Sequence, residues 1–123
     1  MAILNFQKRF TLFVELGIKR QTIRARRKYP IREGEDLFLY TALRTKSAKL
    51  LRRALCTYAR GISIDLGIDG RVEVVVADEG PLSYEEKKDL AAKDGFKSVD
   101  EMFSFFRDRY GLPFEGQLIK WSI

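Results

Sequence analysis

The fold is decided by residues 54–64, ALCTYARGISI, which have the character of a long strand. Apolar and polar residues alternate along them, and Gly61 interrupts the pattern where a glycine inside a strand commonly marks a bend or bulge. We therefore predict one long strand, kinked near Gly61. The pair Asp69-Gly70 predicts a hairpin turn that leads into another strand over 71–77.

Upstream of this strand, residues 21–26 and 37–41 alternate and predict two strands, joined by a loop. Residues 47–51 are ambiguous. Near the N-terminus, three phenylalanines recur at helical spacing and Gly17 supplies the left-handed residue that often ends a helix. Residues 5–16 are therefore predicted to form a helix.

Two helices are predicted in the second half. Ser83 precedes Glu86, and Ser98 precedes Glu101, by the three residues that define a capping box. The second helix carries an apolar stripe that we assign to the core and ends before Gly111. The stripe consists of Val99, Met102, Phe103, Phe106 and Tyr110.

The last segment, residues 117–123, alternates and predicts a final strand. An N-terminal helix, about five to six strands and two helices before the last strand favour an α+β fold, a small β-barrel, over a parallel doubly wound sheet. A chain of 123 residues has the length of one domain, so we expect a single domain over 1–123.

The composition is that of a globular protein, with 46% hydrophobic and 33% charged residues. No apolar run approaches the roughly 20 residues that span a bilayer, and the N-terminus does not have the pattern of a secretory signal. We expect a cytoplasmic protein with no membrane partner. Cys56 is the one cysteine, which excludes an internal disulfide and favours a buried structural thiol over a nucleophile.

The sequence contains no histidine. This excludes a Ser-His-Asp triad, a Cys-His pair and the usual zinc sites. We expect neither a metal nor a cofactor. Whether the protein is an enzyme stays open, and any catalysis would rest on Lys, Thr, Ser, Tyr or carboxylate side chains.

The charge is divided unevenly along the chain. Residues 1–60 contain 15 Lys and Arg against 4 Asp and Glu, whereas residues 61–123 contain 8 against 13. Such asymmetry steers polyanions toward one face, although each cation alone is compatible with a solvated surface. The basic residues form two groups: Lys19, Arg20, Arg24, Arg26, Arg27 and Lys28; and Arg44, Lys46, Lys49, Arg52 and Arg53.

Gly17 and the following Lys19-Arg20-Gln21-Thr22-Ile23-Arg24 resemble the G-x-K-x-x-T-x-R signature of ASCH domains. Three later segments are similar to further landmarks of that family, in the expected order. They are Gly34-Glu35-Asp36-Leu37, Leu43-Arg44-Thr45-Lys46, and Asp94-Gly95-Phe96 leading into Ser98. The resemblance spans nearly the whole chain.

This resemblance implies a PUA-like barrel with a cleft. Members of the family include RNA-binding domains, a ribonuclease and small amidohydrolases that deacetylate acetylcytidine, and fold alone does not choose among these. In the amidohydrolases a lysine, a threonine and a glutamate act together. Lys19 and Thr22 match the first two, and Asp94 is the nearest candidate for the third, with a side chain one methylene shorter.

Side chains two apart on a strand point the same way, so we expect Thr22, Arg24 and Arg26 to share one face, with Lys19 just before it. Arg24 could grip a phosphate or a base edge through its fork of donors, Lys19 could supply a mobile charge and Thr22 a hydroxyl contact. Four further residues are candidates for the same ligand: Tyr29, which could stack on a base, and Arg44, Thr45 and Lys46.

The leading hypothesis is therefore a domain that binds RNA or a nucleotide. One alternative is a hydrolase of a modified nucleoside, or a ribonuclease, that uses Lys19, Thr22 and Asp94. A third hypothesis is a protein-interaction domain whose acidic second half meets a basic partner.

Overall fold

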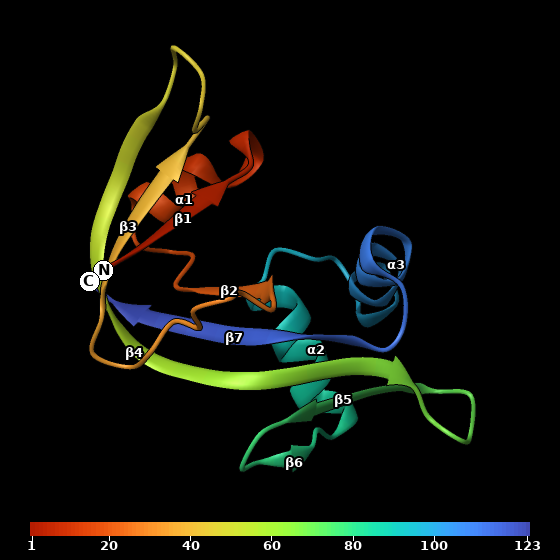
Figure 1. The fold of residues 1–123 in the computed structure, drawn as a ribbon. Coiled ribbons are helices and arrows are strands. Elements are labelled where there is room, and N and C mark those ends of the chain that lie inside the picture. Colours follow the sequence, from red (N-terminus) through yellow and green to blue (C-terminus); the bar gives the residue numbers. More distant parts are fainter. The chain divides into compact units, whose positions relative to one another are not determined.

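The computed structural model describes all residues from Met1 to Ile123 and contains seven strands and three α-helices (Figure 1). None of the helices has the length and the apolar character needed to cross a membrane. The elements follow in the order β1 (Ala2–Phe6), a 3-10 turn η1 (Lys8–Phe10), α1 (Thr11–Glu15), β2 (Gln21–Ala25), β3 (Asp36–Thr41), β4 (Lys49–Leu66), β5 (Val72–Val76), β6 (Gly80–Pro81), α2 (Tyr84–Lys93), α3 (Val99–Tyr110) and β7 (Phe114–Ser122).

The strands pair in the order β1-β3-β4-β5-β6, and β7 pairs with β2 and β4. The sheet is mixed, because β1 runs parallel to β3 whereas β3, β4, β5 and β6 pair antiparallel. The predicted α+β class is confirmed. Seven strands replace the five to six that we expected, and closure into a barrel is not shown by this pairing.

The predicted N-terminal helix over 5–16 is wrong. Residues 2–6 form β1, in which buried and exposed side chains alternate, and only Thr11–Glu15 are α-helical. The alternation of Ala2, Leu4 and Phe6 is a strand pattern, and burial of these side chains against the parallel strand β3 outweighs the helical spacing of the phenylalanines.

The other main elements lie where the sequence predicted them. The long strand over 54–64 is the middle of β4, which also takes in most of the ambiguous segment 47–51. Ser83 and Glu86 form a complete capping box. At the start of α3 the Ser98 hydroxyl accepts the amide of Glu101 at 3.0 Å.

The chain divides into two compact units, which we describe separately. Unit 1 comprises Met1–Gln21, Ile31–Ala59 and Ile119–Ile123, and unit 2 comprises Thr22–Pro30 and Arg60–Leu118. Strands β2, β4 and β7 contribute residues to both units. The expectation of one domain over the whole chain stays a prediction.

Unit 1 has its own hydrophobic core. The ring of Phe6 from β1 meets Trp121 from β7 edge to face, with the ring centroids 5.9 Å apart. Cys56 is buried in the same core as a free thiol, and burial raises the pKa of that thiol. The cluster consists of Ala2, Leu4, Phe6, Val14, Ile31, Leu37, Leu39, Leu51, Cys56, Ile119 and Trp121.

Unit 2 is organised around Phe106 of α3. Its ring centroid lies 4.5 Å from that of Phe114 on β7 and 6.0 Å from that of Phe96, which follows α2. The predicted apolar stripe of α3 is confirmed as core except at its end, because Tyr110 is half exposed.

Gly116 of β7 lies directly against the backbone of β2. A Cβ atom at this position would overlap the carbonyl oxygen of Arg24 and would also crowd the Phe114 ring. Because β2 and β7 are paired strands, only a residue without a side chain permits this approach. Gly116 therefore sets where β2 presents its side chains in unit 2.

We expect Gly116→Ala to lower the free energy of unfolding by about 1–3 kcal/mol, because the added methyl forces β2 away from β7. Urea denaturation followed by circular dichroism measures this change. Gly61→Ala is the matched control, since its Cβ would meet only the Ala77 Cβ at an ordinary 3.8 Å. Equal stability of the two variants would contradict the proposed constraint.

Candidate functional site

Thr22 and Arg24 of β2 form the centre of a polar group in unit 2. The Thr22 side chain is buried, Arg24 is half-buried, and the Arg24 Nε donates a hydrogen bond to Thr22 Oγ1 at 3.0 Å. This places the two side chains on one face of the strand. A buried hydroxyl and a guanidinium are thereby fixed relative to each other.

Asp94 is brought to this group by the end of α2. The amide of Gly95 donates to the Ala92 carbonyl and that of Phe96 to the Ala91 carbonyl, with Gly95 in the left-handed region at φ 96°. This is a Schellman motif, which fixes the backbone at a helix end. It holds Asp94 in a buried position, where its carboxylate acts electrostatically on Arg24.

Burial lowers the pKa of the Arg24 guanidinium, and the Asp94 carboxylate opposes that change. Tyr110 acts in the same direction as Asp94, whereas the positive charges of Arg27 and Arg109 lower the pKa further. Two further guanidinium groups, those of Arg27 and Arg109, and one buried carboxylate, that of Asp94, therefore lie within electrostatic reach of Arg24. The local charge balance is positive.

Asp94 also lies at the carboxyl end of a helix, where the helix dipole is negative. A buried carboxylate there is disfavoured by both the dipole and the loss of hydration. The positive charge of Arg24 offsets this cost. The two side chains are therefore interdependent.

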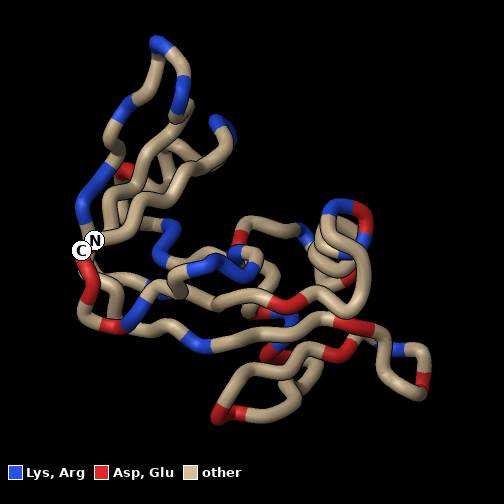
Figure 2. The backbone as a smooth tube through the Cα atoms, viewed as in Figure 1, with Lys and Arg blue, Asp and Glu red and all other residues tan.

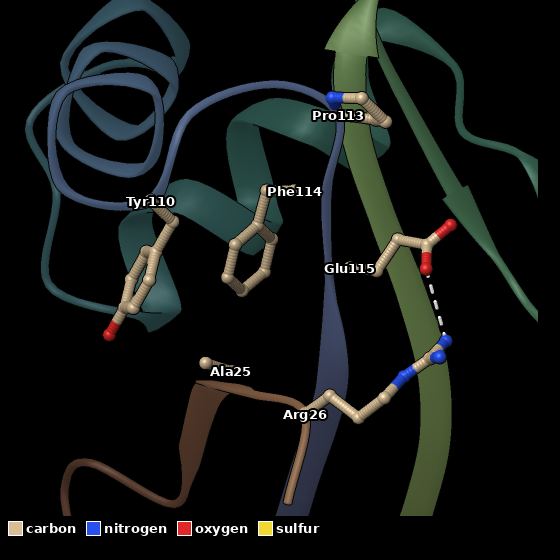
Figure 3. Close-up of a pocket in the computed structure, with 6 residues that line it drawn as sticks. All are labelled: Ala25, Arg26, Tyr110, Pro113, Phe114 and Glu115. Carbon is tan, nitrogen blue, oxygen red and sulfur yellow. Dashed lines mark hydrogen bonds and ion pairs between the residues drawn. The ribbon is translucent and has the colours of Figure 1, made fainter.

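A hollow of about 390 Å³ opens in unit 2, beside the end of β2 (Figure 3). The rings of Tyr110 and Phe114 stand at one side of it, and at the other side Arg26 and Glu115 form an ion pair at 3.1 Å. The prediction that Arg26 extends the polar face of Thr22 and Arg24 stays without support, because Arg26 lies beyond β2 and turns to Glu115. The lining residues are Ala25, Arg26, Tyr110, Pro113, Phe114 and Glu115.

Tyr29 is 78% exposed in the segment after β2, where an aromatic ring is open to a ligand. The Lys28 Nζ lies 5.6 Å from the centre of its ring. Tyr29 lies in unit 2, in the basic segment that follows β2. No described contact joins it to Thr22 or Arg24.

Lys19 belongs to unit 1, whereas Thr22 and Arg24 belong to unit 2. Its side chain is buried, and its Nζ lies 4.9 Å from the centre of the Phe10 ring. The aromatic face stabilises the ammonium charge in this buried position. Lys19 is thus a buried cation packed on an aromatic ring, and its contact with a ligand stays a prediction.

The loop between β3 and β4 presents two cations in unit 1. Arg44 and Lys46 are exposed, and neither forms an ion pair with a carboxylate. Figure 2 shows basic residues in this loop and along the first half of β4. Unit 1 as a whole contains 11 Lys and Arg against 4 Asp and Glu.

Thr45 holds this loop in shape. Its hydroxyl donates to the Ala42 carbonyl at 2.7 Å and accepts the Ser47 amide at 3.1 Å. Ala42 and Arg44 are both in the left-handed region, at φ 52° and 66°. Residues without the freedom of glycine adopt this conformation only where the surroundings impose it. Thr45 thus positions its neighbours, and its contact with a ligand stays a prediction.

Four residues in or near the hollow were not identified as site residues from the sequence. Tyr110 looked like core because it continues the stripe of α3, and nothing in the pattern marked Arg109, Phe114 or Glu115. Only the stop signal at Gly111 and Pro113 could have indicated that the chain turns there and leaves the last helical side chain open.

Comparison with known proteins gave no relative. No family model, no curated protein and no solved structure matches this chain.

We expect Arg24→Met to lower the free energy of unfolding by about 1–3 kcal/mol, because it removes the positive charge opposite the buried Asp94 carboxylate. Urea denaturation measures the loss, and combining the change with Asp94→Asn should recover part of it. Arg71→Met is the control, since Arg71 is largely exposed and only loosely paired with Asp69. Additive losses in the double variant would argue against the coupling.

Proposed function

We propose that the protein binds RNA or a nucleotide, as an ASCH-type domain with a PUA-like fold. The observation that carries this proposal is the loop between β3 and β4, which holds Arg44 and Lys46 exposed and unpaired in a constrained turn. Fold stability does not require two unpaired cations there. A polyanion supplies the missing negative charge. A cytoplasmic location, where RNA is abundant, fits this proposal.

The charge of unit 1 supports binding to a phosphate backbone. Its excess of cations creates a positive field that steers a polyanion, and each neutralised phosphate releases condensed counterions. Because the loop is held by Thr45 and by the Asn5 side chain, which accepts the Leu43 amide at 3.1 Å, little ordering entropy is lost on binding.

The Arg24 group of unit 2 supports recognition of a single phosphate or a base edge. A guanidinium presents a planar fork of donors that matches a phosphate, and Arg27 and Arg109 add positive charge nearby. The hydrogen bond to Thr22 orients Arg24 in advance, and the Asp94 carboxylate stabilises its charge. Preorganised donors of this kind favour binding.

The same geometry supports nucleophilic catalysis by Thr22 less well than it supports binding. A nucleophilic hydroxyl needs a base that removes its proton, but here Thr22 Oγ1 accepts a hydrogen bond from a guanidinium. Lys19, which the resemblance groups with Thr22 and which would have to act as the base, is packed on Phe10. Binding requires neither residue to change its state.

We expect the double variant Arg44→Gln/Lys46→Gln to bind single-stranded RNA more weakly and with a smaller salt dependence. The slope of log K against log salt is negative, and each lost phosphate contact makes it shallower by about 0.7. Fluorescence anisotropy with a labelled ten-nucleotide RNA, titrated from low to moderate salt, measures both quantities.

Lys88→Gln/Lys93→Gln is the matched control for this experiment. These two lysines are exposed on α2 and are already paired with Glu85 and Asp89, so their loss should leave the salt slope nearly unchanged. The proposal fails if the native protein does not bind RNA at low salt, or if the two double variants behave alike.

A second candidate function is hydrolysis of a modified nucleoside of the acetylcytidine type, or of RNA. The observation that favours it is the buried Asp94 carboxylate, which acts electrostatically on Arg24, the donor to the Thr22 hydroxyl; buried carboxylates with specific charge partners are common at catalytic sites. In this scheme the Asp94 carboxylate stands in for the glutamate of the amidohydrolases.

Release of acetate from N4-acetylcytidine, followed by chromatography, tests this candidate. If the Thr22 hydroxyl is the nucleophile, Thr22→Val should abolish the reaction while keeping the side-chain shape, and Asp94→Asn should slow it by about 100-fold or more. No product with the native protein, or full activity in Thr22→Val, rules out this mechanism.

A further inference from the structure

We propose that a single-stranded RNA binds across the exposed side of the sheet that β1, β3 and the first half of β4 form in unit 1 (Figure 1). The inference rests on the proposed function and specifies the surface and the form of RNA that fits it. Three features carry it: exposed apolar side chains on this side of the sheet, an aromatic ring and a guanidinium at its centre, and the basic loop at its end.

The pairing of the strands sets which side chains share this side of the sheet. Along β3, Leu37 and Leu39 are fully buried, so Phe38 and Tyr40 point the other way. Their partners on β1 and β4 point in the same direction, because opposed residues of paired strands lie on one face. We call this surface the outward face; it consists of Ile3 and Asn5 of β1, Asp36, Phe38 and Tyr40 of β3, and Leu50, Arg53 and Leu55 of β4.

The opposite side of the sheet is covered by the chain itself. Val14 of α1 packs there in the hydrophobic core, and the Arg52 guanidinium donates two hydrogen bonds to the Glu15 carbonyl. On the outward face, by contrast, Ile3 and Leu50 are each 41% exposed, and they flank the two aromatic rings of β3. Exposed apolar side chains that adjoin one another, rather than being scattered, mark interaction sites.

Tyr40 and Arg53 offer two planar groups on which bases stack. The Phe38 ring supports the Arg53 guanidinium, whose Cζ lies 4.9 Å from the centre of the ring. Tyr40 follows two residues later, about 6.5 Å along the strand, and its ring packs against no other aromatic ring. Single-stranded RNA stacks its unpaired bases on aromatic rings of a sheet and on arginine planes. Two successive bases therefore fit this pair.

The charges on the outward face favour a phosphate backbone. Arg53 is exposed and forms no ion pair with a carboxylate, so its positive charge is available to a phosphate. Asp36 is the one carboxylate among the outward positions, and it lies at the end of β3 that is away from the β3–β4 loop. A polyanion is therefore attracted to the part of the face between Arg53 and that loop.

The basic loop is anchored to the same face. Asn5 stands opposite Tyr40 in the pairing of β1 with β3, and its side chain accepts the Leu43 amide at 3.1 Å. This hydrogen bond draws the start of the loop to the outward side of β1, near Tyr40. Arg44 and Lys46 follow directly in the chain, so the phosphates of a strand stacked on Tyr40 have cations ahead of them.

The test compares a labelled ten-nucleotide RNA, CAACAACAAC, with its duplex by fluorescence anisotropy at moderate salt. We expect the single strand to bind about 5-fold to 150-fold more tightly than the duplex, because only unpaired bases can stack on Tyr40 and Arg53. A protein that recognised phosphates alone would show no such preference for the single strand.

Two variants separate stacking from charge. Tyr40→Leu should weaken binding of the single strand by about 5-fold to 150-fold without changing the salt slope, whereas Tyr40→Phe should bind as the native protein does. Arg53→Gln should weaken binding and make the salt slope shallower by about 0.7. The control is Phe13→Leu, because Phe13 is an exposed aromatic residue of unit 1 that lies on α1, outside the outward face.

Circular dichroism of each variant checks that the fold is kept, and the exposed Arg53→Gln carries the test if Tyr40→Leu unfolds. The inference is overturned if the duplex binds as tightly as the single strand, or if Tyr40→Leu and Arg53→Gln both bind as Phe13→Leu does. In either case the native protein still binds RNA, so the proposed function stands. A native protein that binds neither form of RNA contradicts the proposed function itself.

Discussion

The close contact between β2 and β7 at Gly116 governs the arrangement of unit 2. Without a side chain at Gly116, the carbonyl of Arg24 can lie against β7, and the Arg24 side chain bonds to Thr22 within electrostatic reach of the buried Asp94. The same strand β7 begins at Phe114, which forms one wall of the hollow. A single missing methyl group thus permits both the polar group and the aromatic wall.

The parts of the structure that the sequence predicted well depend on local chemistry. A capping hydroxyl three residues before a glutamate, or a glycine in a turn, acts within one turn of the chain, and Ser83 and Gly70 lie where expected. The N-terminal helix was wrong because β1 owes its conformation to parallel pairing with β3, more than thirty residues away. Periodicity in a single segment does not report such pairing.

In the candidate site, too, features set by local sequence were predictable, whereas features set by distant parts of the chain were not. The strand pattern of 21–26 was enough to place Thr22 beside Arg24, but only the family resemblance linked Asp94 to them. Tyr110 could not be separated from the core stripe, because exposure of the last helical residue depends on how the chain leaves α3. Net charge did not reveal this group either, since unit 2 holds 12 Lys and Arg against 13 Asp and Glu, yet two further arginines lie within electrostatic reach of Arg24.

The burial of Cys56 provides a built-in reporter of conformational opening. Only a thiolate reacts quickly with alkylating or disulfide reagents, and both its enclosure and its raised pKa keep this thiol unreactive while unit 1 is closed. Its rate of labelling under native conditions therefore measures how often that core becomes accessible to solvent. Because the chain contains one cysteine, the signal comes from a single, known position.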